Sequence, residues 1–123
     1  AYSKRNFYLQ MHISQYCLEH HTVPLNPFLI FRYFIGDSVP RETVYEGNNN
    51  LVRISKEVWV FDEVSNGVLA EVRHKKEQGG KVKYFRHYSD KAPIAYRRIA
   101  TDKVEFEAPK LGDEDLEKYR GEL

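Results

Sequence analysis

The stretch that most constrains the fold runs from residue 56 to residue 85. Val58–Phe61 is a run of β-branched and aromatic residues without polar alternation, which is typical of a strand buried on both faces. A helix is predicted to follow, because Ser65 and Asn66 are both favourable N-cap residues and no proline occurs before the stop signal Gly79-Gly80. Val82–Phe85 then begins a second extended apolar run. The stretch therefore predicts a βαβ unit and an α/β protein.

Glu71 lies on the second turn of this predicted helix. Helical side chains lean toward the N-terminus, so Glu71 should project over Gly67, which leaves an open space. It would then face the carboxyl ends of the strands, where open α/β sheets bind ligands, beside a helix N-terminus at Ser65 that can bind an anion. This arrangement fits a nucleotide site. Alternatively, Glu71 is a solvated residue paired with Lys75, since Glu four positions before Lys is a common surface pair.

Composition limits the classes of partner. The chain has 123 residues, enough for one domain, and 19 basic against 18 acidic residues give a net charge of +1. We therefore expect no nucleic-acid or membrane partner, and favour a small ligand or a protein. Cys17 is the single cysteine, which excludes an internal disulfide. No long apolar segment or signal-peptide pattern occurs, so a cytoplasmic location is expected. The histidine spacings match no metal-ligand pattern, and no metal or cofactor is expected.

The first half of the chain predicts further elements. Phe7–His20 has an apolar stripe at helical spacing. Thr22–Phe28, with two prolines, can hold only a short strand. Phe28–Ile35 is aromatic-rich and fits either a buried helical turn or a dimer surface. A helix is predicted from Pro40 to Ile54, although Gly47–Asn50 inside it lowers helix stability. The three asparagines there either read a ribose or base edge, or mark a local kink with solvated amides.

The last third is less regular. Arg86–Pro93 is predicted to be a loop and Ile94–Ile99 a short helix. Val104–Ala108 alternates with period two, which suits an edge strand. Residues 109–123 are charged and are expected to form a peripheral, partly helical end of the single domain 1–123.

Several segments together resemble the nucleoside 2-deoxyribosyltransferase-like superfamily, which includes nucleoside deoxyribosyltransferases and 5′-monophosphate nucleotide N-glycosidases. The resemblance covers roughly residues 2 to 86. Its most specific part is a strand, a helix start of the form Gly-x-x-x-Glu, and then Gly-Lys-x-x-x-Phe. It implies a flavodoxin/Rossmann-like three-layer sandwich with a mostly parallel sheet, whose first strand is missing or truncated here. The segments are Pro24–Phe28, Asn48–Arg53, Glu57–Phe61, Ser65–Glu71 and Gly80–Phe85.

The resemblance also implies roles for individual residues. Glu71 falls where those enzymes have the nucleophile that attacks the anomeric carbon. Ser65 matches the serine that binds the 5′-phosphate in the nucleotide hydrolases, which favours a nucleotide over a nucleoside. Asn48 lies near the position of a second catalytic aspartate, and Asp62 and Glu63, at the end of the predicted strand, are candidate substitute carboxylates. The other residues implied around the phosphate, sugar and base are Tyr2, Arg5, Asn26, Phe28, Asn66 and Gly67.

Three functions are therefore open. The first is an N-glycosidic bond hydrolase or transferase that acts on a nucleoside 5′-monophosphate. The second is a non-catalytic nucleotide-binding or sensing module, because the amides of Asn48 and Asn66 replace expected carboxylates and cannot exchange a proton at neutral pH. The third is an interaction domain in which Phe28–Phe34 forms a homodimer. Members of the superfamily usually dimerise, so a homodimer is expected with the first function too.

Overall fold

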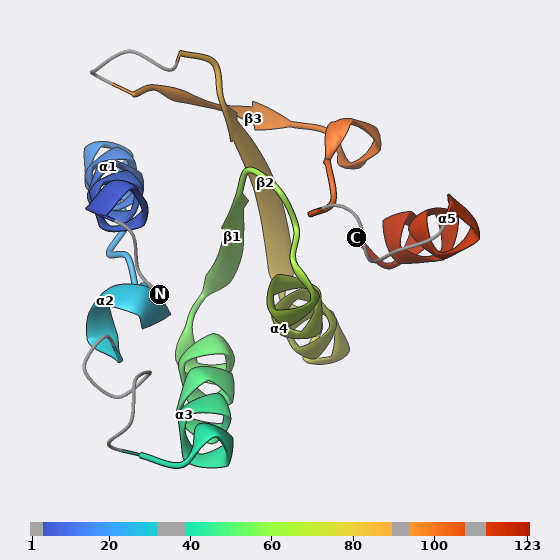
Figure 1. Ribbon diagram of the computed structural model, residues 1–123, viewed down its shortest axis with the longest axis horizontal. Helices are drawn as coiled ribbons and strands as arrows, with labels where there is room; N and C mark the ends of the chain where they lie inside the picture. The colour runs from blue at the N-terminus through green and yellow to red at the C-terminus, as the bar shows by residue number, and fades with distance from the viewer. Residues whose placement is uncertain (1–3, 32–38, 90–93, 108–112) are drawn as a thin grey trace.

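The computed structural model describes residues 4–31, 39–89, 94–107 and 113–123 of the chain. Three strands and several helices form a mixed α/β arrangement (Figure 1). In chain order the elements are α1 (Lys4–Glu19), α2 (Pro27–Ile30), α3 (Arg41–Ile54), β1 (Glu57–Phe61), α4 (Asn66–Glu77), β2 (Lys81–His87), β3 (Tyr96–Ile99), the 3-10 helix η1 (Thr101–Lys103) and α5 (Asp113–Glu122).

The predicted βαβ unit is confirmed. Strand β1 pairs in parallel with β2, from Glu57 opposite Lys81 to Phe61 opposite Phe85, and α4 makes the crossover between them. Its N-cap is Ser65, one of the two candidate N-cap residues in the sequence. The carboxyl ends of both strands therefore lie at the same end of the sheet, where the loop that follows β1 leads into α4.

The prediction of a mostly parallel sheet is wrong for its third strand. The strand order is β1-β2-β3, and β3 runs antiparallel to β2, with Tyr96 opposite His87 and Ile99 opposite Tyr84. Only eight residues, 88–95, separate β2 from β3. A parallel crossover needs a dozen or more residues, so this connection can only return the chain antiparallel. No strand precedes β1 in the described part of the chain. Within that part, the side of β1 that faces away from β2 has no partner strand.

Three further predictions of local structure are corrected. The strand expected over Thr22–Phe28 is absent: residues 22–26 belong to no strand, and α2 begins at Pro27, where proline suits a first helical position. Ile94–Ile99 is not a helix, because its last four residues, Tyr96–Ile99, pair with β2 as β3. The edge strand expected over Val104–Ala108 is reduced to one isolated bridge between Val64 and Phe106. Residues 32–35 of the aromatic run lie outside the described residues.

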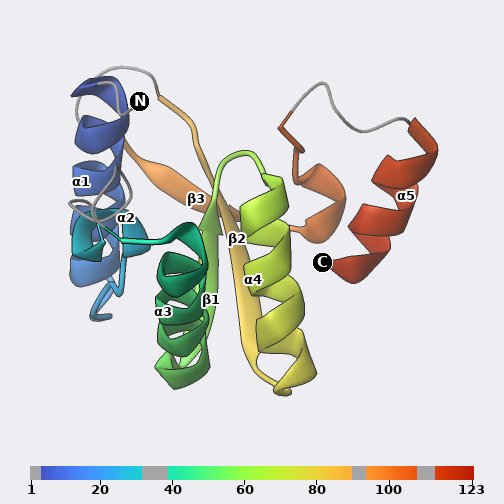
Figure 2. The same cartoon turned by 60° about the horizontal axis from the view of Figure 1, so that its bottom comes forward.

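Different side chains cover the two faces of the sheet. Helices α3 and α4 lie on one side of it (Figure 2), above a core cluster that includes Val60, Leu69 and Val72. On the other side, α1 places the Tyr16 ring within 6.4 Å of the rings of Trp59, Phe61, Phe85 and Tyr96, measured between ring centroids. Helices therefore pack on both faces of the small sheet.

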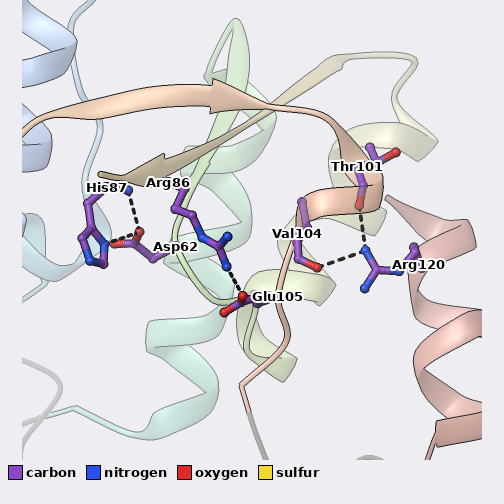
Figure 3. A network of polar contacts seen from close by, with 7 residues as sticks. All are labelled: Asp62, Arg86, His87, Thr101, Val104, Glu105 and Arg120. Atoms are coloured by element: carbon purple, nitrogen blue, oxygen red, sulfur yellow. Dashed lines mark hydrogen bonds and ion pairs between the residues drawn. The ribbon is translucent and has the colours of Figure 1, made fainter. Parts of the chain in front are cut away.

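The C-terminal helix is attached to the same core. Leu123 is 8% exposed and belongs to the core cluster, and Tyr119 packs against that cluster. Arg120 donates to the carbonyl oxygens of Thr101 and Val104, at 2.8 and 3.0 Å (Figure 3). These contacts fasten α5 to the segment that follows β3. None of the helices, within the residues described, is long and apolar enough to cross a membrane.

Candidate functional site

Glu71 lies between two helices. It is partly buried on α4, and its Oε1 accepts a hydrogen bond of 2.6 Å from the side-chain amide of Asn48 on α3. Burial raises the pKa of the Glu71 carboxyl above its ordinary value, and the Asn48 hydrogen bond acts in the opposite direction. The structure thus brings together the two residues predicted to be catalytic.

The alternative interpretation, a solvated Glu71 paired with Lys75, is wrong. Lys75 is 4% exposed, and its Nζ donates to the carbonyl oxygens of Val52, at 3.0 Å, and Ser55. These carbonyls lie at the C-terminal end of α3, where a cation is favourable. Lys75 is therefore a cap for the neighbouring helix. Gly80 leaves room for it, because a Cβ at Gly80 would lie only 2.7 Å from Lys75 Cε.

The asparagine-rich part of α3 also has a packing role. A Cβ at Gly47 would lie 3.2 Å from the Phe31 ring, so the glycine lets this ring approach the helix. The next residue, Asn48, points its amide at Glu71. Its Oδ1 is buried and has no hydrogen-bond partner among the residues described. Asn48 thus offers a further acceptor beside the carboxylate, while Asn49 and Asn50 are exposed.

The N-terminus of α4 lies near the carboxyl ends of β1 and β2 and has a geometry that can bind an anion. Ser65 Oγ accepts from the backbone N–H of Val68 at 3.2 Å, which leaves the first amides of the helix, at Asn66 and Gly67, without intrahelical partners. Asn66 and Gly67 are exposed, and a Cβ at Gly67 would meet only Ser65 Oγ, at 3.9 Å. The space predicted above Gly67 is therefore present.

Asp62 follows β1 with a backbone φ of +64°, a left-handed conformation that is uncommon outside glycine. Its Oδ1 accepts from the backbone N–H of His87 at 3.0 Å and lies 2.8 Å from His87 Nδ1 (Figure 3). Sequence reasoning missed His87. Its position at the end of a strand parallel to β1 is the signal that would have placed it beside Asp62.

Asn26, another residue predicted to line the site, contacts α1. The Asn26 amide donates to Gln10 Oε1 at 2.7 Å and so joins the start of α2 to α1. Tyr2 and the side chains of Arg5 and Phe28 lie outside the described residues. Within that described part, no group of three His, Cys, Asp or Glu side chains is placed to hold a metal ion. A hollow of about 410 Å³ lies elsewhere, along residues 82–84 and 98–101.

These features define a small mixed α/β domain with a partly buried carboxylate behind a capped helix N-terminus. The chain belongs to the family described as "Domain of unknown function (DUF7768)", whose model matches residues 2–85. This range contains Asn48, Ser65 and Glu71, and ends two residues before His87. No curated protein and no solved structure matches the chain.

Proposed function

We propose that the chain is a hydrolase or transferase of the N-glycosidic bond of a nucleoside 5′-monophosphate, with Glu71 as the nucleophile. The observation that carries the proposal is the environment of Glu71. It is a partly buried carboxylate held by one donor, on a helix whose N-terminus offers amides to an anion. A flavodoxin/Rossmann-like three-layer framework is part of this proposal.

The proposed chemistry uses each of these groups. The N–H groups at Asn66 and Gly67 and the Ser65 hydroxyl hold the 5′-phosphate. One oxygen of Glu71 attacks the anomeric carbon while the bond to the base breaks, which gives a glycosyl-enzyme that water or a second base then resolves. Asn48 keeps the carboxylate oriented and favours its charged form. It supplies no proton, because an amide does not exchange one at neutral pH.

One observation favours a second function, a non-catalytic nucleotide-binding or sensing module. The side chain that contacts Glu71 is an amide, and burial favours the uncharged form of this carboxyl by raising its pKa. A neutral carboxyl binds a ligand by hydrogen bonds but does not attack an anomeric carbon. The two functions therefore differ in whether Glu71 is ionised when the nucleotide is bound.

The test is incubation of the protein with ribo- and deoxyribonucleoside 5′-monophosphates and chromatography of the released base. Wild type should release base, and Glu71→Gln should release none while still binding nucleotide in calorimetry. Glu77→Gln, an exposed position on the same helix, is the matched control and should behave as wild type. Binding without release from any nucleotide would favour the sensing module. Neither binding nor release would contradict both functions.

We also propose that the chain is a homodimer, as the resemblance implies. Ile30, at the end of α2, is 43% exposed, and Tyr45 on α3 is 51% exposed. Such apolar and aromatic surface is what an interface would cover. Light scattering after size-exclusion chromatography gives the molar mass directly, and a value near the chain's 14.5 kDa would contradict the dimer.

A further inference from the structure

The pairing between β2 and β3 stops before β2 does. Strand β3 pairs with the C-terminal part of β2, and the last pair places Ile99 opposite Tyr84. After Ile99 the chain leaves the sheet and enters η1, whereas β2 begins at Lys81 (Figure 1). Residues 81–83 therefore have β1 on one side and, within the described part of the chain, no strand on the other.

Two hydrogen bonds show in which direction the backbone groups of β2 point. The carbonyl oxygen of Phe85 accepts from the N–H of Asp62, which follows β1, at 2.8 Å. The N–H of Tyr88 donates at 3.1 Å to the carbonyl oxygen of Ala95, which precedes β3. Successive residues of a strand direct these groups to opposite sides, so the even-numbered residues of β2 face the β3 side. The N–H and C=O of Val82 thus face the open side, and neither has a hydrogen-bond partner among the described residues.

This open side coincides with a hollow. Val82 and Tyr84 line the space of about 410 Å³, which is within the range of about 300–1,000 Å³ that ligand sites occupy. Tyr84 is 4% exposed, and its hydroxyl has no hydrogen-bond partner in the part of the chain that the structure describes. Such a buried hydroxyl is uncommon, and a ligand that brings an acceptor would satisfy it. The side chains of Val82, Tyr84 and Ile99 all belong to the core cluster or pack against it.

The other face of the same edge is cationic. Side chains alternate along a strand, so Lys81 and Lys83 lie on the face opposite Val82, and Arg98 lies there too because it stands beside Phe85 in the register. Lys83 pairs with Glu57 at 3.0 Å. Lys81 and Arg98 are exposed and form no ion pair with the residues described. The open edge therefore has one apolar side and one side with an excess of positive charge.

We propose that this edge of β2 binds an extended acidic segment of a partner protein, which adds to the sheet in line with β3. One residue of the segment exchanges both backbone hydrogen bonds with Val82, as a hydrogen-bonded pair of an antiparallel ladder does. Its neighbours stand opposite Lys81 and Lys83 and are acidic, because opposite charges across two strands are favourable. The side chain opposite Val82 enters the hollow beside Tyr84. Threonine suits this position, since it is β-branched and its hydroxyl can accept from Tyr84.

The experiment titrates the ¹⁵N-labelled protein with the peptide acetyl-Ser-Glu-Thr-Glu-Ser-amide and follows the backbone amides by NMR. The Val82 amide should shift downfield and saturate, because its N–H gains an acceptor, and the other shifts should be concentrated at residues 81–84 and 98–101. The matched ligand is the same peptide with an N-methyl group on threonine, which cannot donate to the Val82 carbonyl. It should bind about tenfold more weakly or worse.

Variants of the protein test the charges and the hydroxyl. Lys81→Glu should weaken binding by about threefold to tenfold, and should bind the peptide with lysine in place of both glutamates better than wild type does. Lys76→Glu, exposed on α4, makes the same change of net charge and should bind as wild type. In Tyr84→Phe the preference for threonine over valine at the centre of the peptide should be lost.

Several results would overturn the proposal. A Val82 amide that does not shift at any peptide concentration, or equal affinity for the N-methylated peptide, would contradict strand addition. Equal losses in Lys81→Glu and Lys76→Glu would show that only net charge matters. Tighter binding of oligothymidylate, with the same amides shifted, would identify a nucleic-acid surface instead. None of these results depends on Glu71, so the N-glycosidase proposal stands or falls separately.

Discussion

Asn48 on α3 donates its side-chain amide to the Glu71 carboxylate on α4 at 2.6 Å, across 23 positions of sequence. The two residues join the helices that cover one face of the sheet. They also determine how easily the carboxylate ionises, because burial and this hydrogen bond shift its pKa in opposite directions.

Replacing Asn48 should therefore change both stability and titration. In Asn48→Ala the Glu71 carboxylate loses this hydrogen bond. A hydrogen bond to a charged group contributes about 1.5–3 kcal/mol, and the higher helix propensity of alanine offsets about 0.6 kcal/mol of that loss. We expect a net loss of about 1–2 kcal/mol at pH 7 by urea denaturation. The pKa of Glu71 should rise further, as measured by carboxyl ¹³C NMR.

Asn48→Asp is the matched variant, with similar size and no amide donor. Two carboxyls at this distance share one proton, so the variant should be destabilised at pH 7 and recover as the pH is lowered. Unchanged stability and unchanged Glu71 titration in both variants would show that this hydrogen bond contributes nothing in solution.

Glu71→Gln should make the protein more stable at neutral pH. The folded state raises the pKa of Glu71, so folded protein binds the proton more tightly than unfolded chain. The resulting stability is fully present below the unfolded pKa of about 4.3 and is lost as the pH rises through the folded value. Glutamine cannot ionise and does not suffer this loss.

The measurement is the difference in unfolding free energy between Glu71→Gln and wild type as a function of pH. The difference should favour the variant at pH 7 and shrink toward pH 4. Glu77→Gln, exposed on the same helix, should stay within about 0.5 kcal/mol of wild type. A variant less stable than wild type at pH 7 would mean that the burial of Glu71 is compensated by contacts that glutamine cannot make.

Sequence patterns predicted the parts of the fold that depend on near neighbours. In the unit from β1 to β2, helix α4 has its N-cap at Ser65, and the left-handed Gly79, with a φ of +76°, follows its C-terminal end. Both signals are local in the sequence. By contrast, β3 is a strand because it pairs with β2. Ile94–Ile99 is too short to show a hydrophobic periodicity that distinguishes a strand from a helix.

The same distinction holds at the candidate site. The prediction of a site at Glu71 rests on its place on a helix that the sequence defines well. The role of Lys75 depends on carbonyls 20 and 23 positions away, and spacing within one helix pointed instead to a surface pair with Glu71. His87 was missed for a similar reason, since its contact with Asp62 spans two strands.

The contact between Lys75 and Gly80 should give a measurable coupling. Gly80→Ala places a Cβ 2.7 Å from Lys75 Cε, an overpacked contact that should cost about 1–3 kcal/mol. Lys75→Ala leaves carbonyls at the end of α3 without a donor, at a similar cost of about 1–3 kcal/mol. Lys75→Ala removes all three of the atoms nearest to the added methyl group, which are Lys75 Cγ, Cδ and Cε.

A double-mutant cycle measured by urea denaturation tests this. The double variant should be more stable than the sum of the two single losses predicts, by at least 1 kcal/mol, which is within the range of about 0.5–3 kcal/mol seen for contacting residues. Gly79→Ala is the control, because its cost comes from positive φ and should be additive with Lys75→Ala. Additive losses at Gly80 would show that the lysine chain moves aside freely.

Ser65 separates the structural and ligand-binding roles of the α4 N-terminus. Its Oγ accepts from the Val68 amide, so Ser65→Ala should cost about 1 kcal/mol of stability as an N-cap is lost. Ser65→Asp keeps an N-cap and adds a favourable charge for the helix dipole, so its stability should equal or exceed wild type. In the proposed site, however, that carboxylate would face the 5′-phosphate. Calorimetry should therefore show weaker binding of nucleoside monophosphates to Ser65→Asp, with binding of the corresponding nucleosides retained. Equal loss for nucleotide and nucleoside would place the phosphate elsewhere, and tighter nucleotide binding would contradict an anion site at this helix end.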